Sequence, residues 1–194
     1  GNSGTQMGGW FRKEIKSLDD LKGLKMRIPG LGGEALQRAG GTPVTLAGGE
    51  IFTALETGAI DATEWIGPYN DLAFGLYKAA KYYYYPGWHE PGTCLEAIIN
   101  QKAFESLPAD LQEIVLTCCH AVNETMNAEF AARNSEALQS LVNDHGVELR
   151  RFPDDVLKKL RELSYQVIEE GAASDPLYAR VYESVRAFQE RSAA

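Results

Sequence analysis

The sequence lacks any long hydrophobic run, any excess of basic residues and any pair of histidines at metal-ligand spacing. Its 194 residues are 44% hydrophobic, yet no segment approaches the roughly 20 apolar residues that a membrane-spanning helix needs. Nineteen basic and 27 acidic residues give a net charge of −8, and the scattered Lys and Arg residues disfavour nucleic acid as a partner. We therefore expect a soluble globular protein. An anionic small molecule would need a local Arg or a bound cation.

Cysteine is scarce, and its three positions do not form a zinc motif. Cys118 and Cys119 are neighbours inside a helical pattern, where adjacent side chains point apart. We expect buried free thiols, while a disulfide from Cys94 to either of the others stays open. The chain also begins without an initiator Met, a signal peptide or a basic region, so we expect it to be part of a longer protein.

The stretch from Ala47 to Asp71 combines a helix, its stop, a strand and a loop. Apolar positions at helical spacing predict a helix from Glu50 that ends at Gly58 as a left-handed C-cap. Residues 60–66 predict a strand ended by Gly67-Pro68. Ligands meet the carboxyl ends of strands in α/β proteins, so Glu64 and Trp65 become the first candidate site residues. The alternative is a solvated Glu beside a packing Trp.

Arg27 lies near the end of another predicted strand, residues 24–28, and a glycine-rich turn follows it. The planar guanidinium can make two parallel charge-assisted hydrogen bonds to a carboxylate, which predicts an anion site. The alternative is an Arg that pairs with a surface Glu. The glycines match neither a dinucleotide-binding nor a P-loop pattern. Alternation of strands and helices through residue 66 predicts an α/β fold with a mainly parallel sheet.

Residues 82–92, YYYYPGWHEPG, have the most unusual composition of the chain. The four tyrosines predict a strand covered on both faces, and the prolines and glycines predict a rigid loop that presents His89 and Glu90. The spacing does not favour zinc. Oxygen donors at Gln6, Glu64 and Glu90 favour a hard cation instead.

The second half of the sequence is predicted to be mainly helical. Residues 93–100 predict a strand, and residues 147–150 another. An apolar face that begins after Pro108 continues to Asn143, which predicts either one helix of roughly 50 Å or two helices with a break near Asn134. Two amphipathic helices follow, from Pro153 to Glu170 and from Pro176 to about Arg191.

The motifs LKGLKMRIPG, AGGEIFTALETGAIDATEWIGPY and YYYYPGWHEPG, in this order, closely resemble the solute-binding proteins of TRAP transporters (DctP-like). The ATEW and YYYYPGW elements resemble the 2-oxo-acid-binding subgroup. The resemblance implies a periplasmic-binding-protein-like fold of two lobes (type II-like), with mixed sheets flanked by helices and a long lobe-bridging helix. It covers only the C-terminal part of such proteins, so most of the N-terminal lobe is expected to lie outside this chain.

The resemblance assigns residues 1–62 and 105–194 to the C-terminal lobe. It assigns residues 63–104 to a remnant of the N-terminal lobe that lines the cleft. Strand edges left without partners in such a remnant favour a homodimer or strand exchange.

The resemblance also implies a function: periplasmic binding of a small 2-oxo monocarboxylate such as pyruvate, which is delivered unchanged to the TRAP permease subunits. Arg27 matches the arginine that pairs with the substrate carboxylate. A bridging Na⁺ or Ca²⁺ would be held at positions that match Gln6, Glu64, Trp65 and Glu90, with Gln6 and Trp65 also near the substrate. Tyr69 and Trp88 are candidates for the wall of the site.

Three alternatives remain open. The same binding role could serve lactate or another 2-hydroxy acid. An enzyme could use Glu90 or His89 as a general base, although the sequence contains no visible set of nucleophile, base and orienting residue. A sensory ligand-binding domain for an organic acid is the third alternative.

Overall fold

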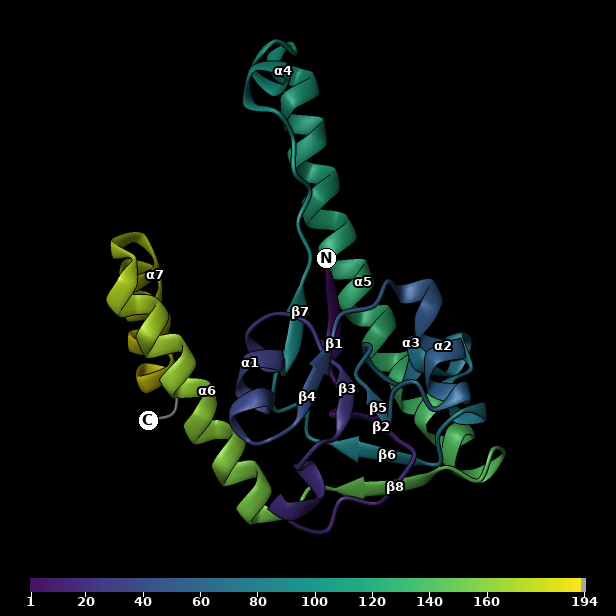
Figure 1. The fold of residues 1–194 in the computed structure, drawn as a ribbon. Helices are drawn as coiled ribbons and strands as arrows, with labels where there is room; N and C mark the ends of the chain where they lie inside the picture. Colours follow the sequence, from purple (N-terminus) through teal and green to yellow (C-terminus); the bar gives the residue numbers. More distant parts are fainter. Residues whose placement is uncertain (193–194) are drawn as a thin grey trace. The chain divides into compact units, whose positions relative to one another are not determined.

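The computed structural model describes residues 1–192, and the chain forms two compact units. The first unit comprises Gly1–Lys13 and Glu64–Arg151, and the second comprises Glu14–Thr63 and Phe152–Ala194. Each unit contains strands and helices, which confirms the predicted α/β class (Figure 1). No helix within the described residues is long and apolar enough to cross a membrane.

The first unit contains a group of three hydrogen-bonded strands and a separate pair. β2 (Gly9–Phe11) runs antiparallel to β6 (Tyr82–Tyr85), which runs parallel to β8 (Glu148–Arg151). β1 (Asn2–Thr5) pairs antiparallel with β7 (Gly92–Cys94). The predicted tyrosine strand is confirmed, and its two middle rings are buried, whereas Tyr85 is 38% exposed.

The helices of the first unit are dominated by α5 (Ala109–Asn143), a single helix of 35 residues. No Gly or Pro interrupts this segment, so the predicted alternative of a break near Asn134 is wrong. α3 (Pro68–Phe74) and β1 pack against it. The short elements are η2 (Leu76–Lys78) and α4 (Gln101–Glu105).

The predicted strand over residues 93–100 is wrong beyond Cys94. Residues 95–100 have no regular structure and run beside the first half of α5 (Figure 1). Their apolar pattern suggested a strand, but they have no partner strand within residues 1–192. Several apolar side chains of this region are exposed, including Ile98 at 88% and Val122 at 60%.

The second unit is built on the parallel strands β4 (Thr42–Val44), β3 (Lys25–Arg27) and β5 (Ala62–Thr63). Its helices are η1 (Leu18–Leu21), α1 (Gly30–Arg38), α2 (Gly48–Thr57), α6 (Asp154–Ser174) and α7 (Pro176–Ser192). Gly58 adopts the left-handed conformation predicted for the cap of α2, with φ 78°. α1 packs against α6, and α6 against α7.

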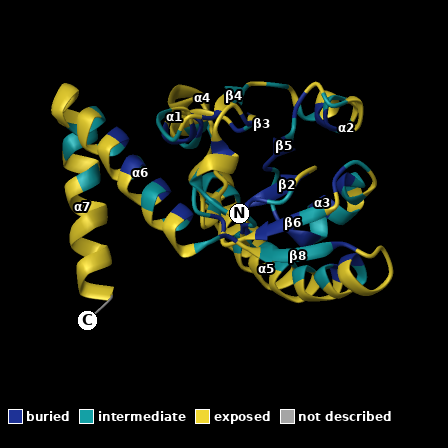
Figure 2. Cartoon of the chain, turned by 60° about the horizontal axis from the view of Figure 1, so that its bottom comes forward, coloured by how far each residue is buried: buried dark blue, intermediate teal, exposed yellow. Residues whose placement is uncertain are grey.

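Burial differs strongly along the chain. The first unit buries Trp10, Phe11, Tyr83 and Tyr84, and the Trp10 and Tyr83 rings stack at 4.0 Å. In the second unit, side chains of the strands, α1, α2 and α6 form the core. α7 and the first half of α5 are mostly exposed (Figure 2). All three cysteines are free and exposed, so the expected burial of these thiols is wrong, because two lie on this uncovered half of α5.

Candidate functional site

Backbone hydrogen bonds bring three separate segments of the first unit together. Gln6 N–H donates to the Pro91 carbonyl at 3.2 Å, and Met7 N–H donates to the Ile66 carbonyl at 3.1 Å. Ile66 closely follows Glu64 and Trp65, and Pro91 directly follows His89 and Glu90. The structure therefore gathers the N-terminal segment, the end of the predicted 60–66 strand and the proline-rich loop at one place.

This arrangement also explains why β5 stops at Thr63. The prediction extended the strand to Ile66, which is wrong. Ile66 N–H donates to the Asp71 carboxylate at 3.2 Å and its carbonyl accepts from Met7, so neither group pairs with β3. The backbone of Glu64, Trp65 and Ile66 consequently leaves the strand and joins the first unit.

Gly87 permits the close approach of the proline-rich loop to Gln6. A Cβ at position 87 would lie 2.7 Å from the Gln6 carbonyl oxygen and 3.0 Å from the carbonyl oxygen of Glu90. Both contacts are with backbone atoms, which cannot rotate away as a flexible side chain could. A side chain at position 87 would therefore separate two parts of the site.

The polar side chains that these neighbouring segments carry are named here the Gln6 group: Gln6, Glu64, His89 and Glu90. Gln6 and Glu64 are 3% and 4% exposed. The Gln6 amide nitrogen donates to the Thr93 hydroxyl, which donates to Glu90 Oε1 at 3.0 Å. The other end of the amide, Gln6 Oε1, is buried and has no hydrogen-bond partner among the residues described.

His89 lies beside Glu64, with His89 Nε2 at 3.5 Å from Glu64 Oε2. Both side chains are 5% exposed. This distance exceeds the usual range for an N–H···O hydrogen bond, and neither ring nitrogen has a hydrogen-bond partner within residues 1–192. Buried polar atoms are nearly always paired in native proteins. The Gln6 group thus contains buried polar atoms that no side chain of the group satisfies with a hydrogen bond.

Asp71 forms a second buried polar cluster, which sequence reasoning missed. Its carboxylate accepts hydrogen bonds from Trp10 Nε1 at 2.8 Å and the Tyr83 hydroxyl at 2.7 Å, besides that from Ile66. We call Asp71, Trp10 and Tyr83 the Asp71 network. Burial raises the pKa of Asp71 to about 6, although its hydrogen bonds oppose this shift. Burial and the adjacent carboxylate raise the pKa of Tyr83 as well.

The three predicted aromatic wall residues make different contacts. Trp65 is half-buried and packs on Phe74, with ring centroids 5.1 Å apart. Trp88 meets the His89 ring edge to face at 5.5 Å. Tyr69 packs its ring against Phe130 of α5 at 5.5 Å. Its backbone N–H donates to the side chain of another α5 residue.

Arg27 belongs to the second unit. It is the last residue of β3, and its Nε donates to the Leu46 carbonyl at 3.4 Å. The side chain is half-buried. Its position at the carboxyl end of a parallel strand agrees with the sequence prediction.

The donor set of the Gln6 group suits a hard cation better than zinc. No group of three or more His, Cys, Asp or Glu side chains is close enough to hold a metal in the part of the chain that the structure describes. An amide oxygen and carboxylates are, however, suitable ligands for Ca²⁺ or Na⁺, with backbone carbonyls or a bound anion completing the shell. The buried and unpaired Gln6 Oε1 fits this chemistry.

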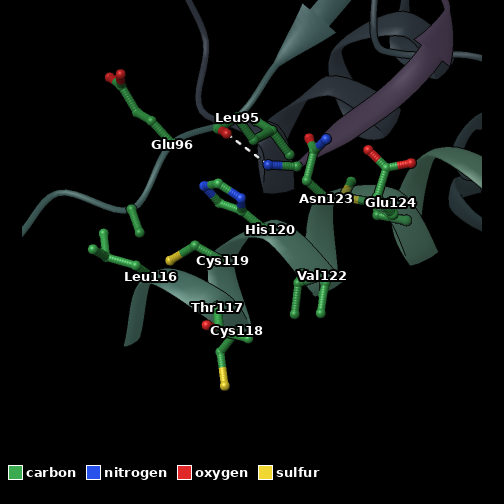
Figure 3. A pocket seen from close by; sticks show the side chains of 14 residues that line it. Leu95, Glu96, Leu116, Thr117, Cys118, Cys119, His120, Val122, Asn123 and Glu124 are labelled. Atoms are coloured by element: carbon green, nitrogen blue, oxygen red, sulfur yellow. Dashed lines mark hydrogen bonds between the residues drawn. The ribbon is translucent and has the colours of Figure 1, made fainter. Parts of the chain in front are cut away.

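A groove of about 1100 Å³ lies elsewhere on the first unit, between residues 95–97 and the first half of α5. Figure 3 shows Cys118, Cys119 and His120 on its helical side. The Gly1 amino group donates to the Leu95 carbonyl at 2.7 Å. None of the predicted site residues lines this groove. The Gln6 group therefore remains the candidate site.

Comparison with known families bears directly on these observations. The sequence profile of DctP, described as bacterial extracellular solute-binding protein, family 7, matches residues 1–175. The chain belongs to this family. This match confirms the resemblance drawn from the three motifs. It also places this DctP protein among transport solute-binding proteins.

Three similar proteins carry more specific names. The monocarboxylate 2-oxoacid-binding periplasmic protein of Nostoc sp. is 48% identical over 98% of this chain and 52% of its own length. A TRAP periplasmic solute-binding protein from Colwellia psychrerythraea, crystallised with calcium and pyruvate, is 46% identical with a TM-score of 0.94. A further TRAP protein, from Pseudoalteromonas atlantica with sodium and pyruvate, is 44% identical with a TM-score of 0.93.

The comparison covers almost all of this DctP chain but only part of those relatives. The match spans 98% and 99% of this chain against 58% of each of the two crystallised proteins. The chain thus spans between half and three-fifths of the length of the relatives it matches.

Proposed function

We propose that this DctP chain is part of the solute-binding subunit of a TRAP transporter, which binds a small 2-oxo monocarboxylate of the pyruvate type. The binding would use a bridging Ca²⁺ or Na⁺. The relatives with bound pyruvate support the substrate class. One of them holds calcium and the other sodium, which supports either cation.

One observation carries the proposal: Gln6 Oε1 is buried without a hydrogen-bond partner in the same group as the buried Glu64 carboxylate. An unpaired buried amide oxygen costs free energy unless a bound species satisfies it. A cation satisfies the oxygen and offsets the negative charge of the carboxylate. It also lowers the repulsion that an anionic substrate would meet near Glu64 and Glu90 in a chain of net charge −8.

We assign the cation ligands to the Gln6 and Glu64 side chains, the Trp65 backbone carbonyl and Glu90. Glu90 is exposed, and Thr93 orients its carboxylate. Arg27 would pair with the carboxylate of the substrate. Trp65, Tyr69 and Trp88 would form apolar walls, with Gln6 also near the substrate.

The role proposed is transport without chemical change, so we propose that the protein is not an enzyme. The longer protein would act in the periplasm and deliver its substrate to the TRAP permease subunits. The assignment of residues 1–62 and 105–194 to one lobe and 63–104 to the other stays a prediction, as does the homodimer. The exposed apolar side chains of residues 95–99 and of the first half of α5 support the presence of a further packed region.

The test is calorimetric titration of pyruvate, other 2-oxo acids and lactate into the chelator-treated longest natural protein that contains this chain. Titrations would be repeated with added Ca²⁺ or Na⁺. We expect saturable, cation-dependent binding of a 2-oxo acid and no turnover. A folded protein that binds no acid with any cation would contradict the proposal.

Substitutions distinguish the residues proposed to bind the acid from those proposed to bind the cation. Arg27→Ala should abolish acid binding while cation binding persists, and Glu64→Gln should weaken both. Glu56→Gln, at an exposed position of α2, is the matched control for the change in charge. Loss of acid binding in Arg27→Ala with unchanged binding in Glu64→Ala and Glu90→Ala would refute the metal site alone.

A further inference from the structure

His89 occupies an unusual position for a histidine. Its side chain is buried to the same extent as that of Glu64, and Nε2 lies 3.5 Å from Glu64 Oε2. No hydrogen bond within the described chain involves either ring nitrogen. This buried imidazole beside a carboxylate calls for an explanation beyond packing, because an apolar ring would fill the same space without unpaired nitrogens.

The backbone holds the imidazole at this place. The loop that carries His89 is attached to the N-terminal segment by the hydrogen bond from Gln6 to Pro91 and by the close approach at Gly87. The ring also rests edge to face against Trp88. The position of His89 beside Glu64 is therefore set by the loop and does not depend on a hydrogen bond of the ring itself.

A carboxylate that binds a cation through one oxygen can accept a hydrogen bond on the other, and such partners orient metal ligands. An imidazole N–H directed at Glu64 Oε2 could perform this task. The separation of 3.5 Å between Nε2 and Oε2 lies only slightly beyond the usual range for such a hydrogen bond.

We infer that His89 is a positioning residue, which donates a hydrogen bond from Nε2 to Glu64 and fixes the carboxylate for cation binding. This inference rests on the proposed function, since it requires that Glu64 binds a cation. It concerns the cation and not the organic acid. If His89 has this role, loss of the N–H weakens cation binding directly. It weakens acid binding only because less cation is bound.

The experiment compares Ca²⁺ affinity in the chelator-treated longest natural protein and its variants, without any organic acid. His89→Phe keeps a ring of similar shape but removes the N–H, and we expect a loss of about tenfold or more in Ca²⁺ affinity. His89→Gln keeps an N–H donor and should recover part of the affinity. His145→Phe is the matched control, because His145 stacks on Tyr77 at 4.1 Å and is exposed.

A second titration, of pyruvate at saturating Ca²⁺, separates the positioning role from direct contact with the substrate. We expect His89→Phe to bind pyruvate nearly as well as the unmodified protein under this condition. Weaker pyruvate binding with unchanged Ca²⁺ affinity would overturn the inference, because the ring would then contact the acid. Equal Ca²⁺ affinity in the unmodified protein, His89→Phe and His89→Gln would overturn it too.

The outcomes also distinguish this inference from the proposed function. If the unmodified protein binds Ca²⁺ and pyruvate but His89→Phe does so equally well, only the role of His89 is wrong. If the unmodified, folded protein binds neither Ca²⁺ nor Na⁺, both the cation site and the role of His89 are overturned. Should His89→Phe fail to fold, the comparison of His89→Gln with His89→Leu supplies the same contrast.

Discussion

Two clusters of buried polar side chains lie in the first unit, and they differ in how their hydrogen bonds are satisfied. In the Asp71 network, one carboxylate accepts from an indole, a phenol and a backbone amide. In the Gln6 group, an amide oxygen and both nitrogens of His89 have no hydrogen-bond partner among the described residues. A satisfied cluster stabilises the fold by itself. A cluster with unused polar atoms indicates a place where something else binds.

Replacing Asp71 should produce the largest effect on stability. Asp71→Ala leaves two buried donors and one half-buried donor without an acceptor, so we expect a loss of about 3–5 kcal/mol in the free energy of unfolding. Urea denaturation followed by circular dichroism would measure it. Asp155→Asn, an exposed change in the first turn of α6, should cost under about 1 kcal/mol. Equal, small losses in both variants would show that the Asp71 network does not stabilise the fold.

The raised pKa of Asp71 predicts a pH dependence of stability. The folded chain keeps this carboxyl protonated up to about pH 6, whereas the unfolded chain ionises it near 3.8. Its contribution to stability is therefore complete below pH 3.8 and is lost as the pH rises to about 6. The shift corresponds to about 3 kcal/mol.

The measurement is the difference in free energy of unfolding between the unmodified chain and Asp71→Asn at several pH values from 4 to 7. Taking the difference cancels the other carboxylates, which titrate in the same range. We expect the unmodified chain to lose stability relative to Asp71→Asn as the pH rises. A constant difference would place the pKa of Asp71 near its ordinary value.

Gly87→Ala tests how the Gln6 group is assembled. The new methyl group would collide with the backbone of Gln6, so we expect a loss of about 1–3 kcal/mol and weaker cation binding. Gly49→Ala is the matched control, because a Cβ there meets nothing within 4 Å. Gly49 lies within α2, so the control should keep or raise stability by up to about 1 kcal/mol. Unchanged stability and cation binding in Gly87→Ala would contradict the close approach.

Gln6→Leu should have the smallest effect on stability and a large effect on binding. The change removes an unpaired buried oxygen together with the hydrogen bond to Thr93, so we expect stability to change by less than about 1 kcal/mol. Ca²⁺ affinity should fall at least about tenfold, measured by calorimetry. Gln37→Leu, exposed on α1, controls for the altered side chain. A large loss of stability with intact Ca²⁺ affinity would place Gln6 with the Asp71 network as a structural residue.

Local signals were sufficient for the end of α2 and for family membership. The cap at Gly58 determined where α2 ends, whereas the pattern of residues 109–143 was compatible with one helix or two until the structure showed one. Three short motifs were sufficient to place the chain in the DctP family. These features depend on residues close together in the sequence, where spacing and backbone conformation alone decide the outcome.

The tertiary structure alone decided which strands persist and which polar groups are satisfied. The strand predicted to Ile66 ends at Thr63 because Met7 and Asp71 bind the backbone of Ile66, and neither contact is encoded in the strand itself. The side chains of Gln6 and Thr93 meet across 87 positions of sequence. His89 reaches Glu64 only because its loop folds back onto Gln6. The sequence could identify these side chains as candidates, but only the long-range packing could show that Gln6 Oε1 has no hydrogen-bond partner among the described residues.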